Sequence, residues 1–130
     1  KDSDTIPVAL PGCSFFINIP FSPARKIIES GLPLVLASDF NPGSAPSFNM
    51  SMINSLACIK MKLLPEEAIN ATTYNAAFAL ELENEVGSIT KGKRANFIVS
   101  KEAMTPATIA YNFGIDWIDQ VYINGNLYNY

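Results

Sequence analysis

Histidine is absent from all 130 residues of the chain. Its absence removes the commonest general base of enzymes, the Ser-His-Asp arrangement of many hydrolases and most catalytic zinc sites. Whatever chemistry a carboxylate of this chain performs, it cannot perform it alone within the chain. No carboxylate can obtain an imidazole partner from within the same 130 residues.

Cysteine, long apolar runs and clustered positive charge are also scarce. Cys13 and Cys58 lie in apolar surroundings without metal-ligand spacing, so we interpret them as reduced core residues of a cytoplasmic protein rather than a disulfide. No stretch approaches the ~20 apolar residues of a membrane helix, and the start at Lys1 does not resemble a signal peptide. The net charge of −3 and the scattered lysines and arginines give no indication of a nucleic-acid or membrane partner.

Apolar residues make up 48% of the chain, which is enough for a sizeable core in one domain of ordinary size. The first part predicts a strand at 6–10, an extended loop or second strand at 13–19, and a strand at 34–37. Between them, Ser22 as the N-cap and Pro23 in the first turn predict a helix that ends at Gly31. This order of strand, helix and strand is typical of a parallel crossover.

Two further helices are predicted from 47 to about 62 and from 65 to about 82. Ser47 opens the first, whose methionines we interpret as core residues rather than a metal site. Glu66 and Glu67 begin the second and resemble a catalytic pair. Adjacent helical residues point about 100° apart, however, so we interpret both as solvated partners of the helix dipole.

Beyond Glu85 the pattern indicates β-structure, with strands at 96–100, 120–123 and 127–130. Asn124-Gly125 between the last two is a strong hairpin signal. Aromatic side chains gather in this part, and we interpret them as packing for a small sheet rather than a stacking surface for bases or sugars. They are Tyr111, Phe113, Trp117, Tyr122, Tyr128 and Tyr130.

The run from Leu34 to Ser44, L-V-L-A-S-D-F-N-P-G-S, places an acidic residue at the exit of a buried strand. Active sites of parallel α/β proteins are built from the loops that leave such strand ends, so Asp39, Asn41, Gly43 and Ser44 are expected to lie together in a site. The alternative is that Asp39 only initiates a turn, as Asp often does before Asn-Pro-Gly.

Several motifs resemble the metal-dependent amidohydrolase superfamily. The segment 86–99, with G-S-x-x-x-G-K, is similar to the stretch where those chains leave the catalytic barrel and complete a small β-sandwich domain, and 64–77 is similar to the helix before it. The resemblance implies an α/β fold: residues 1–85 form the C-terminal part of a (β/α)8 barrel, its last two βα units, and 86–130 the closing strands of the sandwich. Asn96 replaces the usual aspartate, and Leu64 replaces a capping threonine.

The D-F-N-P-G-S run, together with 55–58, resembles the branch of the superfamily that degrades histidine. That implies hydrolysis of the cyclic amide 4-imidazolone-5-propanoate to N-formimidoyl-L-glutamate by a water activated by zinc or iron. Asp39 matches a metal ligand that also accepts the proton of the attacking water. Asn41 and Gly43 match positions that hold the substrate, and Ser44 matches a neighbouring hydroxyl contact. The amide, a free backbone N–H beside Gly43 and the hydroxyl are donors suited to a substrate carboxylate.

The resemblance also shows what the sequence lacks, because the family's histidine ligands lie on earlier strands and a full barrel takes ~250 residues. We therefore expect a C-terminal portion of a longer enzyme that is inactive by itself and forms a homo-oligomer. The complete enzyme would bind a small-molecule substrate. The absence of an initial methionine agrees with this expectation. The alternative is a non-catalytic scaffold or assembly module derived from such a tail.

Overall fold

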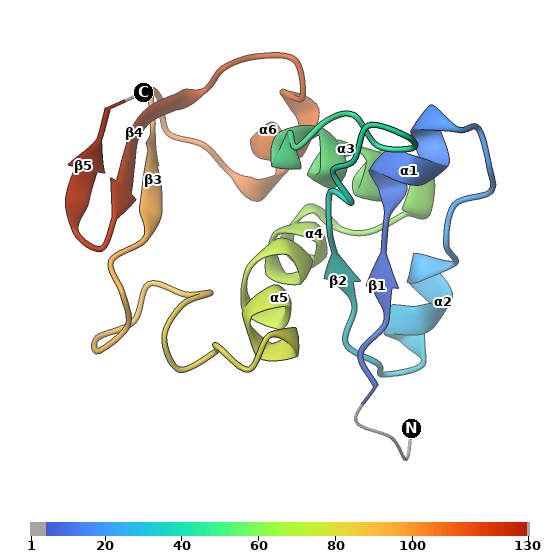
Figure 1. Cartoon of the computed structure of the whole chain (residues 1–130), viewed down its shortest axis with the longest axis horizontal. Coiled ribbons are helices and arrows are strands. Elements are labelled where there is room, and N and C mark those ends of the chain that lie inside the picture. The colour runs from blue at the N-terminus through green and yellow to red at the C-terminus, as the bar shows by residue number, and fades with distance from the viewer. Residues whose placement is uncertain (1–4, 130) are drawn as a thin grey trace.

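The computed structural model describes residues 5–129, whose elements form a helical part around two parallel strands and a separate antiparallel sheet (Figure 1). Strand β1 (Val8–Ala9) pairs in parallel with β2 (Val35–Leu36), with Val8 opposite Val35. The N–H of Val35 donates to the carbonyl of Pro7 at 3.0 Å. The predicted parallel crossover is therefore confirmed, although each strand is shorter than expected.

The crossover contains two helices, α1 (Pro11–Phe16) and α2 (Ala24–Glu29). The expectation of extended structure at 13–19 is wrong, because α1 occupies its first half. Proline begins this helix, where its missing N–H costs nothing, and an apolar run of this length cannot be told from a strand by periodicity. Gly12 allows close packing: a Cβ there would lie 3.0 Å from Cδ1 of Ile53.

Helix α2 begins later than its sequence signal. Pro23, not Ser22, occupies the cap position, and no side chain caps the helix. The predicted end is confirmed, because Gly31 takes a positive φ of 76° and its N–H donates to the carbonyl of Ile28. Glycine suits this position because it adopts the left-handed region without steric cost.

Helix α3 (Met50–Met61) is capped by Asn49, whose side chain accepts the N–H of Met52 at 3.1 Å, so the predicted start at Ser47 is wrong. The single helix predicted from 65 to 82 is also wrong. It divides into α4 (Pro65–Thr72) and α5 (Tyr74–Ala79).

Thr73 separates α4 from α5 with φ −123° and ψ −86°. The Thr72 and Thr73 hydroxyls both donate to the carbonyl of Ile69, and such bonds compete with the helical ladder. Gly87 then packs against this break: a Cβ there would lie 3.1 Å from the carbonyl oxygen of Thr73 and 2.6 Å from the Cβ of Ala77.

Gly87 begins the G-S-x-x-x-G-K loop, which is closed by its own lysine. Lys93 Nζ donates to the carbonyl of Val86 at 3.2 Å and to Ser88 Oγ at 2.7 Å. The same ammonium group lies 5.5 Å from the ring centroid of Tyr74. The motif therefore fastens the loop to the start of α5.

Small and aliphatic side chains form the core where the helices meet the parallel strands. Leu34 and Leu36 of the β2 region are almost completely buried, and alanines such as Ala57 and Ala68 let helices α3 and α4 approach closely. Asn75 Nδ2 donates to the carbonyl of Leu34 at 2.9 Å, which ties α5 to the entrance of β2. No helix within residues 5–129 is long and apolar enough to cross a membrane.

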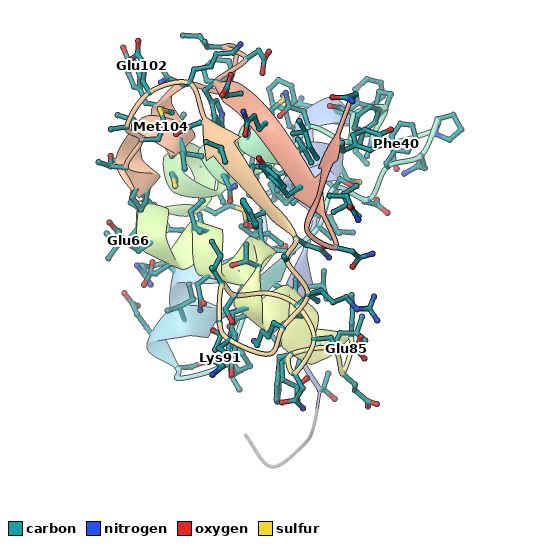
Figure 2. All side chains as sticks on the ribbon, turned by 90° about the vertical axis from the view of Figure 1, so that its left-hand side faces the viewer. Phe40, Glu66, Glu85, Lys91, Glu102 and Met104 are labelled. Atoms are coloured by element: carbon teal, nitrogen blue, oxygen red, sulfur yellow. The ribbon has the colours of Figure 1, made fainter. Side chains whose placement is uncertain are left out.

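The antiparallel sheet has the order β3 (Phe97–Ser100), β4 (Ile118–Ile123) and β5 (Asn126–Tyr128). The predicted hairpin is confirmed, with positive φ at Asn124 and Gly125 as a two-residue turn requires. This sheet faces the viewer in Figure 2, in front of the helices.

A helix that the sequence analysis did not predict, α6 (Pro106–Tyr111), packs against α3 and α4. Thr105 caps it by accepting the N–H of Thr108 at 3.2 Å. The Ser55 hydroxyl donates to the carbonyl of Ala110, and Trp117 Nε1 donates to Ser51 Oγ at 3.2 Å. The segment after Glu85 is therefore joined to the helical part by specific bonds.

The aromatic residues near the sheet play different parts. Tyr122 stacks on Phe97 with ring centroids 4.7 Å apart, as expected of sheet packing. The interpretation is wrong for Tyr111 and Phe113, because Tyr111 lies in α6 and both rings are exposed. Tyr130 lies outside the described residues.

Candidate active-site loop

Asp39 lies in the loop that follows β2, at the same end of the parallel strands as α1 (Figure 1). Its side chain is exposed and its φ is +53°, in the left-handed region. Asp tolerates this conformation better than most residues, but it remains uncommon outside glycine. The predicted position at a strand exit is therefore observed, together with an unusual backbone.

Asn41 organises the loop with its side-chain amide. Oδ1 accepts the backbone N–H groups of Gly43 and Ser44, both at 2.8 Å, while Nδ2 donates to the carbonyl of Asp39 at 2.7 Å and to Ser44 Oγ at 3.1 Å. The backbone N–H of Asn41 also donates to the carbonyl of Ala45. The four predicted site residues thus form one closed turn.

One expectation about this turn needs correction. We expected a free backbone N–H beside Gly43 that could bind a substrate carboxylate, but this N–H is occupied by Asn41. The reason is local: an asparagine side chain mimics a backbone turn by accepting N–H groups two and three residues ahead. The hydroxyl of Ser44 is also engaged within the turn, because it accepts a hydrogen bond from Asn41 Nδ2 at 3.1 Å and donates to Asn41 Oδ1 at 3.3 Å.

Two exposed phenylalanines flank the loop. Phe40 and Phe48 pack edge to face with centroids 5.4 Å apart, and 59% and 75% of their surfaces remain accessible. Figure 2 shows Phe40 on the side of the molecule opposite Glu66. Sequence analysis did not single out this pair, because two phenylalanines eight positions apart in a loop carry no periodic signal.

The described residues do not supply a complete metal site. Within 5–129, no three of His, Cys, Asp or Glu lie close enough together to hold an ion. Asp39 offers one carboxylate, whereas tight zinc binding takes three or four protein ligands. Residues 5–129 by themselves therefore do not fit the metal that the sequence resemblance implies.

Glu67 has a different role from the one expected of a solvated dipole partner. Its carboxylate receives a bidentate pair of bonds from Arg25 of α2, at 2.7 and 3.0 Å, and also accepts the N–H of Leu64 at 2.7 Å. The hydrogen bonds from Arg25 lower the pKa of Glu67 below its ordinary value of 4.5. Glu66 is exposed, as expected.

The remaining candidates are structural. Both thiols are free, and burial raises the pKa of Cys58, so it is a poor nucleophile. A hollow of about 520 Å³ lies between α4, α5 and β3, and none of its lining residues belongs to the loop after β2.

The sequence matches the amidohydrolase family over residues 17–128. This chain belongs to that family. The matched range contains both the loop that follows β2 and the loop closed by Lys93.

Curated relatives in the family are longer than this chain. It is 59% identical to imidazolonepropionase of Christiangramia forsetii over 98% of its own length and 31% of that protein, and 43% identical to imidazolonepropionase of Treponema denticola over 96% and 30%. The chain therefore spans about a third of the length of the relatives it matches.

Solved structures with this fold are also longer. A zinc-bound adenosine deaminase from Xanthomonas campestris superimposes with a TM-score of 0.82 at 22% identity, over 92% of this chain and 31% of that one. Guanine deaminase of E. coli gives a TM-score of 0.79 at 18% identity, over 98% and 34%. These similarities place the chain in an α/β fold of the TIM-barrel type, although the described residues do not close a barrel.

Proposed function

We propose that this chain is the C-terminal part of an imidazolonepropionase, which hydrolyses 4-imidazolone-5-propanoate to N-formimidoyl-L-glutamate. Residues 1–85 would supply the last two βα units of the barrel, and residues 86–130 the closing part of the small β-sandwich domain. In the reaction, water adds to the ring carbonyl carbon, the ring C–N bond breaks, and the released nitrogen takes a proton.

The observation that carries this proposal is the 59% identity to a named imidazolonepropionase over almost the whole chain. The site geometry agrees with it, because the only sequence run assigned to chemistry, D-F-N-P-G-S, lies at the carboxyl end of a parallel strand. Loops at this end of the strands form the active sites of barrel enzymes.

In the proposed enzyme, Asp39 would be one ligand of a zinc or iron ion, and its carboxylate would accept the proton that the attacking water loses. The other ligands would have to come from outside the described residues, since these offer no complete metal site. Such an ion lowers the pKa of water and polarises the carbonyl. Ser44 contributes a hydroxyl contact to the substrate, and Gly43 allows its close approach.

A chimaera tests the proposal: the 127 aligned residues of the Christiangramia forsetii enzyme are replaced by those of this chain. We expect the chimaera to hydrolyse imidazolonepropionate. Asp39→Asn in it should lower kcat by about 100-fold or more, because a ligand and a proton acceptor are lost. Asp119→Asn, a matched change of an exposed carboxylate in β4, should leave kcat unchanged.

The 130-residue chain alone should show no turnover with or without added zinc or iron, since one carboxylate cannot hold the ion tightly. A folded chimaera without activity would contradict the proposal and favour the alternative of a non-catalytic assembly module. Full kcat in Asp39→Asn would show that the aspartate only forms a turn.

A further inference from the structure

Phe40 and Phe48 form an exposed aromatic pair directly after Asp39 in the chain. Their rings meet edge to face with centroids 5.4 Å apart, and 59% and 75% of the two residues remain accessible. Single exposed apolar side chains are common on protein surfaces, whereas apolar groups that gather in one patch mark contact surfaces. The aromatic pair is therefore a candidate contact surface beside the site loop.

The aromatic pair faces away from α1. Of the described residues, Ser47 and Asn49 line a small hollow of about 80 Å³ together with α1, and Phe48 between them does not. Successive side chains of an extended segment point to opposite sides, and Asn49 has extended backbone angles. Figure 2 shows Phe40 at the edge of the molecule. The pair is thus turned outward and not toward the helix beside it.

The strand that leads to Phe40 lacks a neighbour on one side. Within residues 5–129, β2 pairs with β1 and with no other strand, whereas each strand of a closed barrel has two neighbours. Neighbouring strands lie about 4.7–4.9 Å apart. Since Phe40 comes only four positions after Leu36, the last residue of β2, a strand added at the open edge would bring its following loop beside Asp39 and Phe40.

We propose that Phe40 and Phe48 are the surface on which another segment of the longer protein packs as it closes over Asp39, an inference that rests on the proposed function. The described residues offer one carboxylate and no complete metal site, so the segment that supplies further ligands has to reach Asp39. A second copy of this chain would bring only the same carboxylate, because the chain contains no histidine. The chain spans 31% of the Christiangramia forsetii enzyme, and the covering segment belongs to the other part of that protein.

Thiol labelling of the chimaera tests this inference. Phe40→Cys and Phe48→Cys each place a reactive group on the aromatic pair. Ile59→Cys is the matched control, because Ile59 is 66% exposed on the outer face of α3 and no cover is inferred there. A water-soluble maleimide is added to the folded chimaera, and mass spectrometry of the peptides separates these thiols from Cys13, Cys58 and other native cysteines. Circular dichroism reports whether each variant is folded.

We expect the thiols at positions 40 and 48 to react at least about tenfold more slowly than the thiol at position 59, because a covered thiol reacts only when the structure around it opens. In denaturant the three rates should be similar. Dilution from micromolar to nanomolar concentration should not change the ratio, since the cover belongs to the same polypeptide. Unfolding of both phenylalanine variants beside a folded Ile59→Cys would also support burial, because substitutions of exposed residues change stability little.

Equal labelling rates at all three positions of the folded chimaera would overturn the inference. Protection that disappears on dilution would overturn it as well and assign the pair to a contact between copies. Labelling does not require catalysis, so its result is separate from that of the proposed function. Slow labelling of the pair in a folded chimaera without turnover supports the packing surface and overturns the proposed reaction, whereas turnover with fast labelling does the reverse.

Discussion

At the scale of single residues, Gly87 shows how a motif that marks a superfamily can be explained by packing. Its φ of +86° and the 2.6 Å from a virtual Cβ to Ala77 leave no room for a side chain. Gly92 shares the positive φ, but nothing lies within 4 Å of its virtual Cβ. Substitutions at these two glycines therefore separate the energetic cost of a positive φ from the cost of a steric clash.

We predict that Gly87→Ala destabilises the protein most, by about 2–4 kcal/mol, since it combines left-handed strain with a steric clash. Gly92→Ala should cost about 1–2 kcal/mol from conformation alone. Gly114→Ala, with open space and no positive φ, should be nearly neutral. Chemical denaturation of the chimaera measures all three, and equal costs at positions 87 and 92 would contradict the packing argument.

For single residues, the sequence correctly predicted where Asp39 lies but not which hydrogen bonds the loop around it forms. Apolar and turn residues around Asp39 were sufficient to place it at a strand exit. The occupied N–H of Gly43 could not be foreseen, because it depends on the rotamer of Asn41 and on the backbone angles of the turn. For the same reason the hydrogen bonds that Asn41 makes within its own loop could not be predicted from the sequence.

At the scale of elements, the ion pair between Arg25 and Glu67 joins α2 to the start of α4. The carboxylate also accepts the N–H of Leu64, the position without a capping hydroxyl. A side chain three residues into the helix thus supplies one half of a capping box, the half that accepts the N–H of the cap residue, while Leu64 has no side-chain oxygen to accept the N–H groups of the first turn.

This arrangement predicts how stability depends on pH. Because the pKa of Glu67 is lowered in the folded state, its contribution is complete above the ordinary value of about 4.5 and is lost as the pH falls through the lowered value. Glu67→Gln should therefore flatten the loss of stability of the chimaera below pH about 4.5. Glu66→Gln, its exposed neighbour, should keep the original slope. Thermal unfolding between pH 6 and 3 is the measurement, and identical slopes would contradict the prediction.

The helices and helix boundaries that were predicted wrongly show which structural features local sequence signals do not encode. Helix α1 was missed because its apolar run has no periodicity, and the break at Thr73 because no glycine or proline marks it. Helix α6 was missed although Thr105-Pro106 is a good helix start, since the aromatic residues after it suggested a sheet. The hairpin at Asn124-Gly125 was predicted correctly because its turn type demands those residues.

At the scale of the whole molecule, the described part leaves apolar surface without cover. The parallel sheet of residues 5–129 has two strands, so each has an edge without a paired neighbour, and parallel sheets are normally covered on both faces. Large apolar side chains such as Phe16 and Ile89 are more than half exposed. Surfaces of this kind promote association.

We predict that the isolated chain self-associates at micromolar concentration, through its exposed strand edges. Val8 in β1 is 52% exposed, so Val8→Lys should weaken association by placing a charge at that edge. Ile59→Lys, an equivalent change on the outer face of α3, should have little effect. Light scattering reports the mass, and a stable monomer of the unsubstituted chain would contradict the prediction.

The two hydrogen bonds that join the C-terminal segment to α3 predict different patterns of substitution among homologues. Trp117 donates to the hydroxyl of Ser51, a contact between two side chains, so substitutions at these positions should occur together among homologues. Ser55 donates to the backbone carbonyl of residue 110, which every amino acid carries. The hydroxyl at position 55 can therefore persist while position 110 varies, within the small volume that its burial allows.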